Sequence, residues 1–203
     1  MKGILHGYRV LDFGRYIAGP YCAALLGHLG AEVIRVERPG GSEDRTLAPI
    51  TEQGDGALFM QMNANKRGMT LNISQPVGRE VVQKLVATAD IVVANLPIQT
   101  LKALNLDYDS LVQIKEDIIL VTNSAFGNSG PFAERVGFDG VAQAMSGAAF
   151  FTGQPGEPAK AAVQFVDYSS ALSAAFGTLA AVLVRERTGR GQIVETSLLG
   201  TAL

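Results

Sequence analysis

Residues 8–36, YRVLDFGRYIAGPYCAALLGHLGAEVIRV, decide the fold of this 203-residue chain. Tyr8–Phe13 and Glu32–Val36 are rich in apolar and β-branched residues, and each predicts a strand. The segment between them opens with a glycine-bearing loop, has Pro20 where the first turn of a helix tolerates it, and ends at Gly30. Strand, loop, helix and strand in close succession form a βαβ unit, which requires a parallel sheet.

Apolar strands alternate with helical segments along the rest of the chain. Further strands are predicted at Met69–Ile73, Ile91–Ala94, Ile118–Thr122 and Gln192–Ser197, with helices at Pro76–Thr88, Thr100–Leu104, Asp109–Ile114, Phe138–Met145 and Ala171–Val184. Several strands are continuously apolar, as in sheets covered on both faces. The sequence therefore predicts an α/β fold with a doubly wound, Rossmann-like, mostly parallel sheet. The stretch Pro39–Gln53 is expected to be a surface loop.

Composition restricts the possible classes of function. The chain is 47% hydrophobic with a formal net charge of −2, which gives no electrostatic reason to expect a nucleic-acid partner. Its single cysteine, Cys22, excludes internal disulfides and fits a reducing cytoplasm. The N-terminal residues lack the apolar core of a signal peptide. Ala171–Val184 is too short to span a bilayer, so we expect a cytoplasmic protein without a membrane partner.

Familiar catalytic and cofactor signatures are missing from the sequence. His6 and His28 lie far from any cysteine or acidic pattern, so no metal site is predicted. The motifs of P-loop proteins and of serine hydrolases are absent. The loop after the first strand lacks the G-x-G-x-x-G spacing, although Glu37 stands where dinucleotide-binding proteins place a ribose-binding acid. A dinucleotide site therefore stays as an alternative.

Asp167 is the most informative polar residue. Val163–Val166 has the character of a short strand, and Asp167 then precedes the almost wholly apolar segment Ala171–Val184. A helix that is apolar on all sides is expected to be buried. Asp167 is then either an N-cap, for which aspartate is among the best residues, or a carboxylate nucleophile at the mouth of a buried helix. Position alone leaves both readings open.

Loops that follow the predicted strands fall at one edge of the sheet, where doubly wound folds bind ligands. They are Gly14–Gly19, Glu37–Gly40, Asn72–Ser74, Asn95–Pro97 and Ser124–Gly130. Their arginine and asparagine side chains suit a long ligand that carries phosphates and amides. Lys66 and Arg67 form a small basic turn, either solvated or in contact with a phosphate or a neighbouring subunit.

Four stretches together resemble one protein family. They are VLDFGRYIAGPYCAALLGHLGAEVIRVERPGG near the start, FMQMNANKRGMTLNI, SAFGNSGPFAERVGFDGVAQAMSG, and VDYSSALSAAFGTLAAVLVRERTGRGQ near the end. In this order they resemble the N-terminal half of the class III CoA-transferases (the CaiB/BaiF family), which includes formyl-CoA:oxalate and carnitine CoA-transferases. The resemblance extends over essentially the whole chain.

The resemblance implies the chemistry and the residues that carry it. Asp167 corresponds to a nucleophile that moves coenzyme A from an acyl-CoA to a carboxylic acid, through an aspartyl anhydride and an aspartyl-CoA thioester. Coenzyme A is a co-substrate, with no permanently bound cofactor. Its expected contacts are Ile17, Ala18, Arg38, Leu71, Asn72, Ile73, Ser74, Asn95, Leu96, Arg135, Val136, Gly137 and Phe138. The N-terminus of the following helix is expected to keep Asp167 ionised.

Two departures and two alternatives accompany the resemblance. The run Leu96–Gln99 lacks the aromatic, basic and Pro-Gly residues usual in the family, and Ala103 replaces a common basic residue. An α-methylacyl-CoA racemase is one alternative, but Phe138 stands where racemases have a proton-transferring histidine. The other alternative is a non-catalytic CoA-binding fragment.

The resemblance also predicts the domain organisation and the partners. Residues 1–197 would form the large CoA-binding domain, and residues 198–203 the start of a linker helix that is cut in this chain. Family members are longer, with a small domain in a second half, and their subunits thread through each other. The expected partners are therefore an acyl-CoA, a small carboxylic acid, and either a second copy in an interlocked homodimer or a chain that supplies the missing half.

Overall fold

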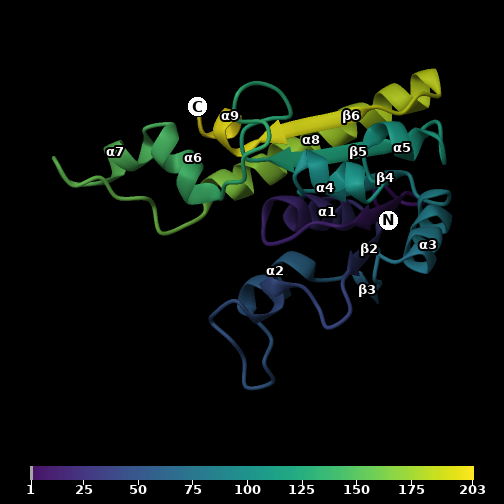
Figure 1. Cartoon of the computed structure of the whole chain (residues 1–203), viewed down its shortest axis with the longest axis horizontal. Helices are drawn as coiled ribbons and strands as arrows, with labels where there is room; N and C mark the ends of the chain where they lie inside the picture. The colour runs from purple at the N-terminus through teal and green to yellow at the C-terminus, as the bar shows by residue number, and fades with distance from the viewer. Residues whose placement is uncertain (1) are drawn as a thin grey trace.

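A computed structural model describes residues 2–203 and shows one six-stranded sheet flanked by helices (Figure 1). The strands are β1 (Arg9–Asp12), β2 (Glu32–Glu37), β3 (Arg67–Thr70), β4 (Ile91–Ala94), β5 (Ile119–Ser124) and β6 (Ile193–Ser197). Every neighbouring pair is parallel, in the order β3-β2-β1-β4-β5-β6. This is the strand order of dinucleotide-binding folds, and the predicted doubly wound α/β fold is confirmed.

Each face of the sheet buries its own set of side chains. Val10, Ile91 and Ile119 face one side and pack against α1 (Ala18–His28) and α8 (Phe165–Thr188). Alternate residues of the same strands, such as Leu11 and Val92, face the other side. That side is covered by α3 (Pro76–Val86), α4 (Ile98–Ala103) and α5 (Tyr108–Val112). Because both faces are covered at the centre of the sheet, a central strand such as β4 has no polar face, which explains its continuous apolar sequence.

Short helices gather beyond the carboxyl ends of the strands. They are α2 (Ala57–Asn63), α6 (Asp139–Met145), α7 (Ala148–Thr152) and α9 (Leu198–Ala202), together with the 3-10 turn η1 (Glu43–Thr46). Figure 1 shows α6 and α7 projecting past the end of the sheet toward which the β6 arrow points. The helix expected from Leu198 is present as α9, and it packs against α6 and α8. The candidate site lies among these helices.

The strand predicted at Val163–Val166 is wrong. Helix α8 already begins at Phe165, because the side chain of Asp139 in α6 accepts hydrogen bonds from the N–H groups of Val166 and Asp167. Two of the free donors of the first turn are thereby satisfied from another helix, 28 residues away in sequence. The sequence around Val163–Val166 gives no indication that Asp139 is the hydrogen-bond partner of this turn.

Helix α8 is also longer than predicted. The helix is 24 residues long, and an 18-residue segment within it has a mean hydropathy of 1.3, so by length and composition it could cross a membrane, contrary to the sequence prediction. In this fold 44% of that segment is buried, and its small residues such as Ala171 and Ala174 belong to the core against α1 and the sheet. A core helix satisfies the same criteria of length and composition.

Two predicted surface segments carry buried charges. In the loop Pro39–Gln53, Asp44 is 1% exposed and accepts two hydrogen bonds of 3.0 Å from the guanidinium of Arg35 in β2. Lys66, expected in a solvated or phosphate-contacting turn, has a side chain only 2% exposed. Its ammonium donates to Asp12 Oδ2 and to the carbonyl of Pro20, each at 2.7 Å. Both loops are fixed to the sheet by ion pairs that the sequence does not reveal.

Candidate active site

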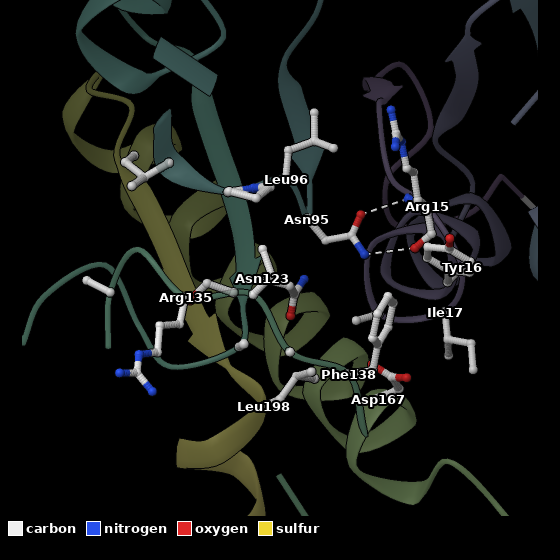
Figure 2. Close-up of a pocket in the computed structure, with 18 residues that line it drawn as sticks. Arg15, Tyr16, Ile17, Asn95, Leu96, Asn123, Arg135, Phe138, Asp167 and Leu198 are labelled. Carbon is white, nitrogen blue, oxygen red and sulfur yellow. Dashed lines mark hydrogen bonds between the residues drawn. The ribbon is translucent and has the colours of Figure 1, made fainter. Parts of the chain in front are cut away.

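The candidate site lies at the switch point of the sheet. From β1, the chain adds β2 on one side and β4 on the other, so the loops after β1 and β4 diverge and leave a crevice. The side-chain amide of Asn95 bridges the two loops (Figure 2). Its Oδ1 accepts a hydrogen bond from the backbone N–H of Arg15 at 2.7 Å, and its Nδ2 donates to the backbone carbonyl of Arg15 at 2.8 Å. A Cβ at Gly19 would lie 3.0 Å from Asn95 Oδ1, which explains the glycine there.

A cavity of about 320 Å³ opens at this crevice. Its walls come from the loops after β1, β4 and β5 and from the segment before α6. It brings together nine of the residues predicted for the site: Ile17, Ala18, Asn95, Leu96, Arg135, Val136, Gly137, Phe138 and Asp167. Figure 2 shows Asp167 beside Phe138 at one end of the cavity and Arg135 across from them. Segments separated by up to 150 residues in sequence thus meet at one cavity.

The other predicted contacts do not line this cavity. Arg38 follows β2 with 59% of its side chain exposed, and it pairs with Glu43 at 3.3 Å. Leu71–Ser74 follows β3, and the N–H of Leu71 donates to the carbonyl of Glu37 at 2.7 Å. Arg38 and Leu71–Ser74 are therefore neighbours at the carboxyl ends of β2 and β3. They lie on the same edge of the sheet as the cavity, but toward the β3 side.

Glu37 itself is committed to other contacts. Its carboxylate accepts from Arg45 at 2.5 and 2.9 Å and from the N–H of Ser42 at 3.0 Å, and the residue is 5% exposed. These partners hold the pKa of Glu37 below its usual value against the opposing effect of burial. A ribose-binding acid needs free oxygens, so this arrangement does not favour the dinucleotide alternative.

A second cavity, of about 860 Å³, adjoins the first. It lies among the loop Leu47–Pro49, α2, α6 and the start of α8. Four residues line both cavities, namely Tyr16, Ile17, Phe138 and Asp167. Asp167 therefore lies at the junction of two spaces.

The surroundings of Asp167 change its acidity. Burial, and next the nearby carboxylate of Asp139, raise the pKa of Asp167 from 3.8 to about 7. The prediction that the helix N-terminus keeps Asp167 readily ionised is wrong, because loss of solvation and a like charge outweigh the dipole. The N-cap reading is also wrong. Gln164 occupies the cap position and Asp167 the first turn.

Asp139 supplies the missing cap from α6. It is 3% exposed, and its Oδ2 accepts from the N–H of Val166 at 2.9 Å and of Asp167 at 3.2 Å. Its Oδ1 accepts from the side-chain amide of Gln143, whose Oε1 accepts from the N–H of Ala161 at 2.7 Å. A single buried network thus fixes the segment before α8 and the turn that carries Asp167.

Sequence reasoning missed several residues that shape the site. Tyr16 has φ +62°, a left-handed conformation that tyrosine rarely adopts, and its N–H donates to Asp44 at 3.0 Å. Its ring packs edge-to-face on Phe138 with centroids 5.5 Å apart. Strained backbone of this kind concentrates at functional sites. No local pattern predicts it, because the strain is held by Asp44, a contact between distant loops.

Below the cavity, Asn123 ties α8 to the sheet. Its Oδ1 accepts from the hydroxyls of Ser170 at 2.9 Å and of Thr196. Asn123 is 4% exposed and Ser170 fully buried. These hydrogen bonds fix the position of the start of α8 relative to β5 and β6.

With this geometry in place, comparison with known proteins identifies the family. The profile of CoA-transferase family III matches residues 5–203. The chain belongs to CoA-transferase family III. It is 37% identical over 199 residues to mouse succinyl-CoA:glutarate CoA-transferase, covering 97% of this chain and 46% of the relative. It is also 37% identical to the beta subunit of succinyl-CoA–L-malate CoA-transferase of Chloroflexus aurantiacus, covering 96% and 49%.

Solved structures of the family have the same fold. A CaiB/BaiF family protein from Brucella suis superposes with a TM-score of 0.94 at 37% identity, covering all of this chain and 55% of that structure. The chain spans about half the length of the curated relatives it matches. The α/β fold of this chain is thus the fold found in CaiB/BaiF family structures.

Proposed function

We propose that this family III chain forms the CoA-binding half of an enzyme that transfers coenzyme A between dicarboxylic acids, with Asp167 as nucleophile. The observation that carries the proposal is the position of Asp167, a half-buried carboxylate where the switch-point cavity meets a second cavity. The first cavity suits the narrow pantetheine arm of coenzyme A. The second is large enough for an acyl group or an acceptor acid.

In the first half-reaction, a carboxylate oxygen of Asp167 attacks the thioester carbonyl carbon. The carbon–sulfur bond breaks, CoA leaves as a thiolate, and an anhydride joins Asp167 to the acyl group. The thiolate then attacks Cγ of Asp167 and releases the donor as a free carboxylate. CoA remains on Asp167 as a thioester.

The second half-reaction reverses these steps with another acid. The acceptor carboxylate attacks Cγ of Asp167, expels the thiolate and forms a new anhydride. The thiolate then attacks the acyl carbon of the acceptor, which gives the new acyl-CoA and the free Asp167 carboxylate. Over the whole cycle one acyl-CoA thioester is broken and another is formed, so no external energy source is needed.

Burial of Asp167 supports this role. A carboxylate with a pKa of about 7 is a stronger nucleophile when ionised than one with an ordinary pKa. The anhydride and the thioester are neutral at this position, so the covalent steps relieve the cost of a desolvated charge near Asp139.

Similarity to relatives supports dicarboxylic acids as substrates. The names of the mouse and Chloroflexus relatives specify succinyl-CoA with glutarate or L-malate. All three acids carry two carboxylates, so one stays free when the other is joined to CoA. We infer the same substrate class here.

Racemisation is a weaker candidate. It needs an acid and a base on opposite sides of the carbon next to the thioester. Phe138 lines both cavities where the resemblance places the histidine of racemases, and its ring cannot move a proton.

Assembly and location complete the proposal. We propose that the active protein is a cytoplasmic interlocked homodimer, or a complex in which a partner chain supplies a second half. The Chloroflexus relatives are named as alpha and beta subunits, which supports an assembly of more than one chain for them. Cys22, which is buried and free, fits a reducing compartment.

Trapping the covalent intermediate tests the chemistry. The complete gene product is incubated with succinyl-CoA without an acceptor acid, digested and analysed by mass spectrometry. We expect CoA on the peptide that contains Asp167, its loss on addition of glutarate, and no modification in Asp167→Ala. Hydrolysis or racemisation of acyl-CoA, with no CoA reaching any carboxylate, would show that the proposal is wrong.

A further inference from the structure

We infer that Lys160 binds the free, distal carboxylate of the dicarboxylic substrate inside the second cavity. The inference rests on the proposed function and adds to it a specificity-determining residue. Lys160 lies in the segment between α7 and α8, and its side chain lines the second cavity but not the first.

Charge singles out Lys160 in this cavity. It is the one lysine or arginine among the residues that line it. Within residues 2–203 its ammonium forms no ion pair, and its only hydrogen bond is a long one of 3.5 Å to the carbonyl of Ala161. An exposed ammonium without an anionic partner is ready to pair with a carboxylate of a ligand.

The other charges of the cavity make a cation necessary. Its two carboxylates belong to Asp139 and Asp167. Both oxygens of Asp139 accept hydrogen bonds, whereas Asp167 is the reacting group. A substrate that brings an additional free carboxylate beside two acidic residues meets repulsion, unless a cation at its far end compensates.

The backbone next to Lys160 is tied to the turn that carries Asp167. The N–H of Ala161, the next residue, donates to Gln143, and Gln143 donates to Asp139, which binds the N–H of Asp167. The Lys160 stem also lies over Gly140, where an added Cβ would be 3.3 Å from Lys160 Cδ. The same buried network therefore orients the nucleophile and the backbone beside the lysine.

The arrangement of the cavity assigns the distal carboxylate, not the reacting one, to Lys160. Asp167 lies at the junction with the first cavity, and Lys160 lies away from that junction. The lining of the second cavity also includes the apolar side chains Leu47, Pro49, Leu58 and Val141. Apolar walls suit the methylene carbons of a succinyl or glutaryl chain, and a cation at the end suits its carboxylate.

The test compares acyl-CoAs that differ only at the distal end. Succinyl-CoA and butyryl-CoA have equally long chains, but a carboxylate in one is a methyl group in the other. In the complete gene product we expect Lys160→Met to lower kcat/KM about tenfold for succinyl-CoA, the effect of losing one partly exposed charge-assisted hydrogen bond, and less than about twofold for butyryl-CoA. Lys160→Arg, which keeps the charge, should retain most of the preference. Lys84→Met, at an exposed lysine of α3, should change neither value.

Each other outcome has a separate meaning. If the wild-type protein transfers CoA from neither donor, the proposed function fails before Lys160 is tested. If transfer occurs but Lys160→Met leaves the ratio of the two kcat/KM values unchanged, the inference is wrong. An equal loss for both donors would place Lys160 on coenzyme A itself and would overturn the inference as well.

Discussion

Oδ2 of Asp139 lies 3.2 Å from the backbone nitrogen of Asp167 and accepts its hydrogen. The same carboxylate that stabilises the turn carrying the nucleophile also brings a negative charge close to it, which helps to raise its pKa. One residue from another helix therefore fixes the position of Asp167 and adds to the effect of burial on its acidity.

The first prediction concerns pH. Only ionised Asp167 attacks, so kcat/KM should rise with pH and level off above about 7. Asp139→Asn removes the like charge, lowers the pKa of Asp167 and should move this rise to lower pH. Steady-state kinetics between pH 5 and 9 measures both. Asp109→Asn, at an exposed position in α5, is the control that should leave the profile unchanged. A profile already level at pH 5 would contradict the raised pKa.

The second prediction concerns stability. Because folding raises the pKa of Asp167 from 3.8 to about 7, the folded state binds more protons in this interval, and stability falls as pH rises through it. Asp167→Asn removes the cost of the buried charge. We expect the variant to be inactive but more stable than wild type at pH 8, by about 2 kcal/mol and at most about 4.

Urea unfolding at two pH values checks this. Near pH 4 most of the difference should disappear, since folded Asp167 is protonated there. Equal stability of the two proteins at pH 8 would show that the carboxylate is not desolvated.

The third prediction uses two adjacent basic residues with opposite environments. Lys66→Met leaves the buried Asp12 carboxylate without its ion-pair partner, at side-chain exposures of 2% and 0%, and should cost about 3–5 kcal/mol. Arg67→Met removes a pair with Glu32 whose arginine is 74% exposed, and should cost less than about 1 kcal/mol. Thermal unfolding of both variants gives the comparison. Similar losses would mean that Lys66 is not a structural residue.

Much of the fold follows from the sequence because its rules are local. The predicted strands at Ile91–Ala94 and Gln192–Ser197 match β4 and β6 within one residue. For β4 the reason is that an apolar β-branched run suits a strand covered on both faces. The start of α8 was not predictable, because its N–H groups bond to Asp139, 28 residues earlier. The strain at Tyr16 and the burial of Lys66 likewise depend on residues from distant loops.

The features of the candidate site also fall into two groups, those that the sequence predicts and those that only the structure shows. Residues of the β1, β4 and pre-α6 loops were predicted through the resemblance, and the switch-point topology brings them together. The resemblance carried no information on acidity, so the raised pKa of Asp167 emerged only from its burial and from Asp139. The sequence gives no role to Lys160, because the cavity it lines is built from segments that are far apart in the chain.

The fourth prediction concerns coenzyme A. Arg38 has 59% of its side chain exposed and follows β2 beside the expected contact segment Leu71–Ser74. If it binds a phosphate of coenzyme A, Arg38→Ala should raise KM for acyl-CoA several-fold with little change in kcat, because this contact is remote from the reacting carbon. Arg190→Ala, in the exposed turn after α8, serves as the control. An unchanged KM would remove Arg38 from the CoA site.

The last prediction concerns the outer face of α8. Phe165, Leu172, Phe176 and Leu183 are 39%, 53%, 76% and 54% exposed. Their spacing of seven, four and seven residues places them on one side of the helix, where they form an apolar stripe. Exposed apolar stripes of this kind favour association. We therefore expect residues 1–203, purified alone, to self-associate, with weak CoA binding and little transferase activity.

Sedimentation velocity over a range of concentrations measures the association. Phe176→Gln should weaken it, whereas Ile4→Gln, which removes an equally exposed apolar side chain outside the stripe, should not. A chain that stays monomeric at every concentration would exclude the stripe as an interface.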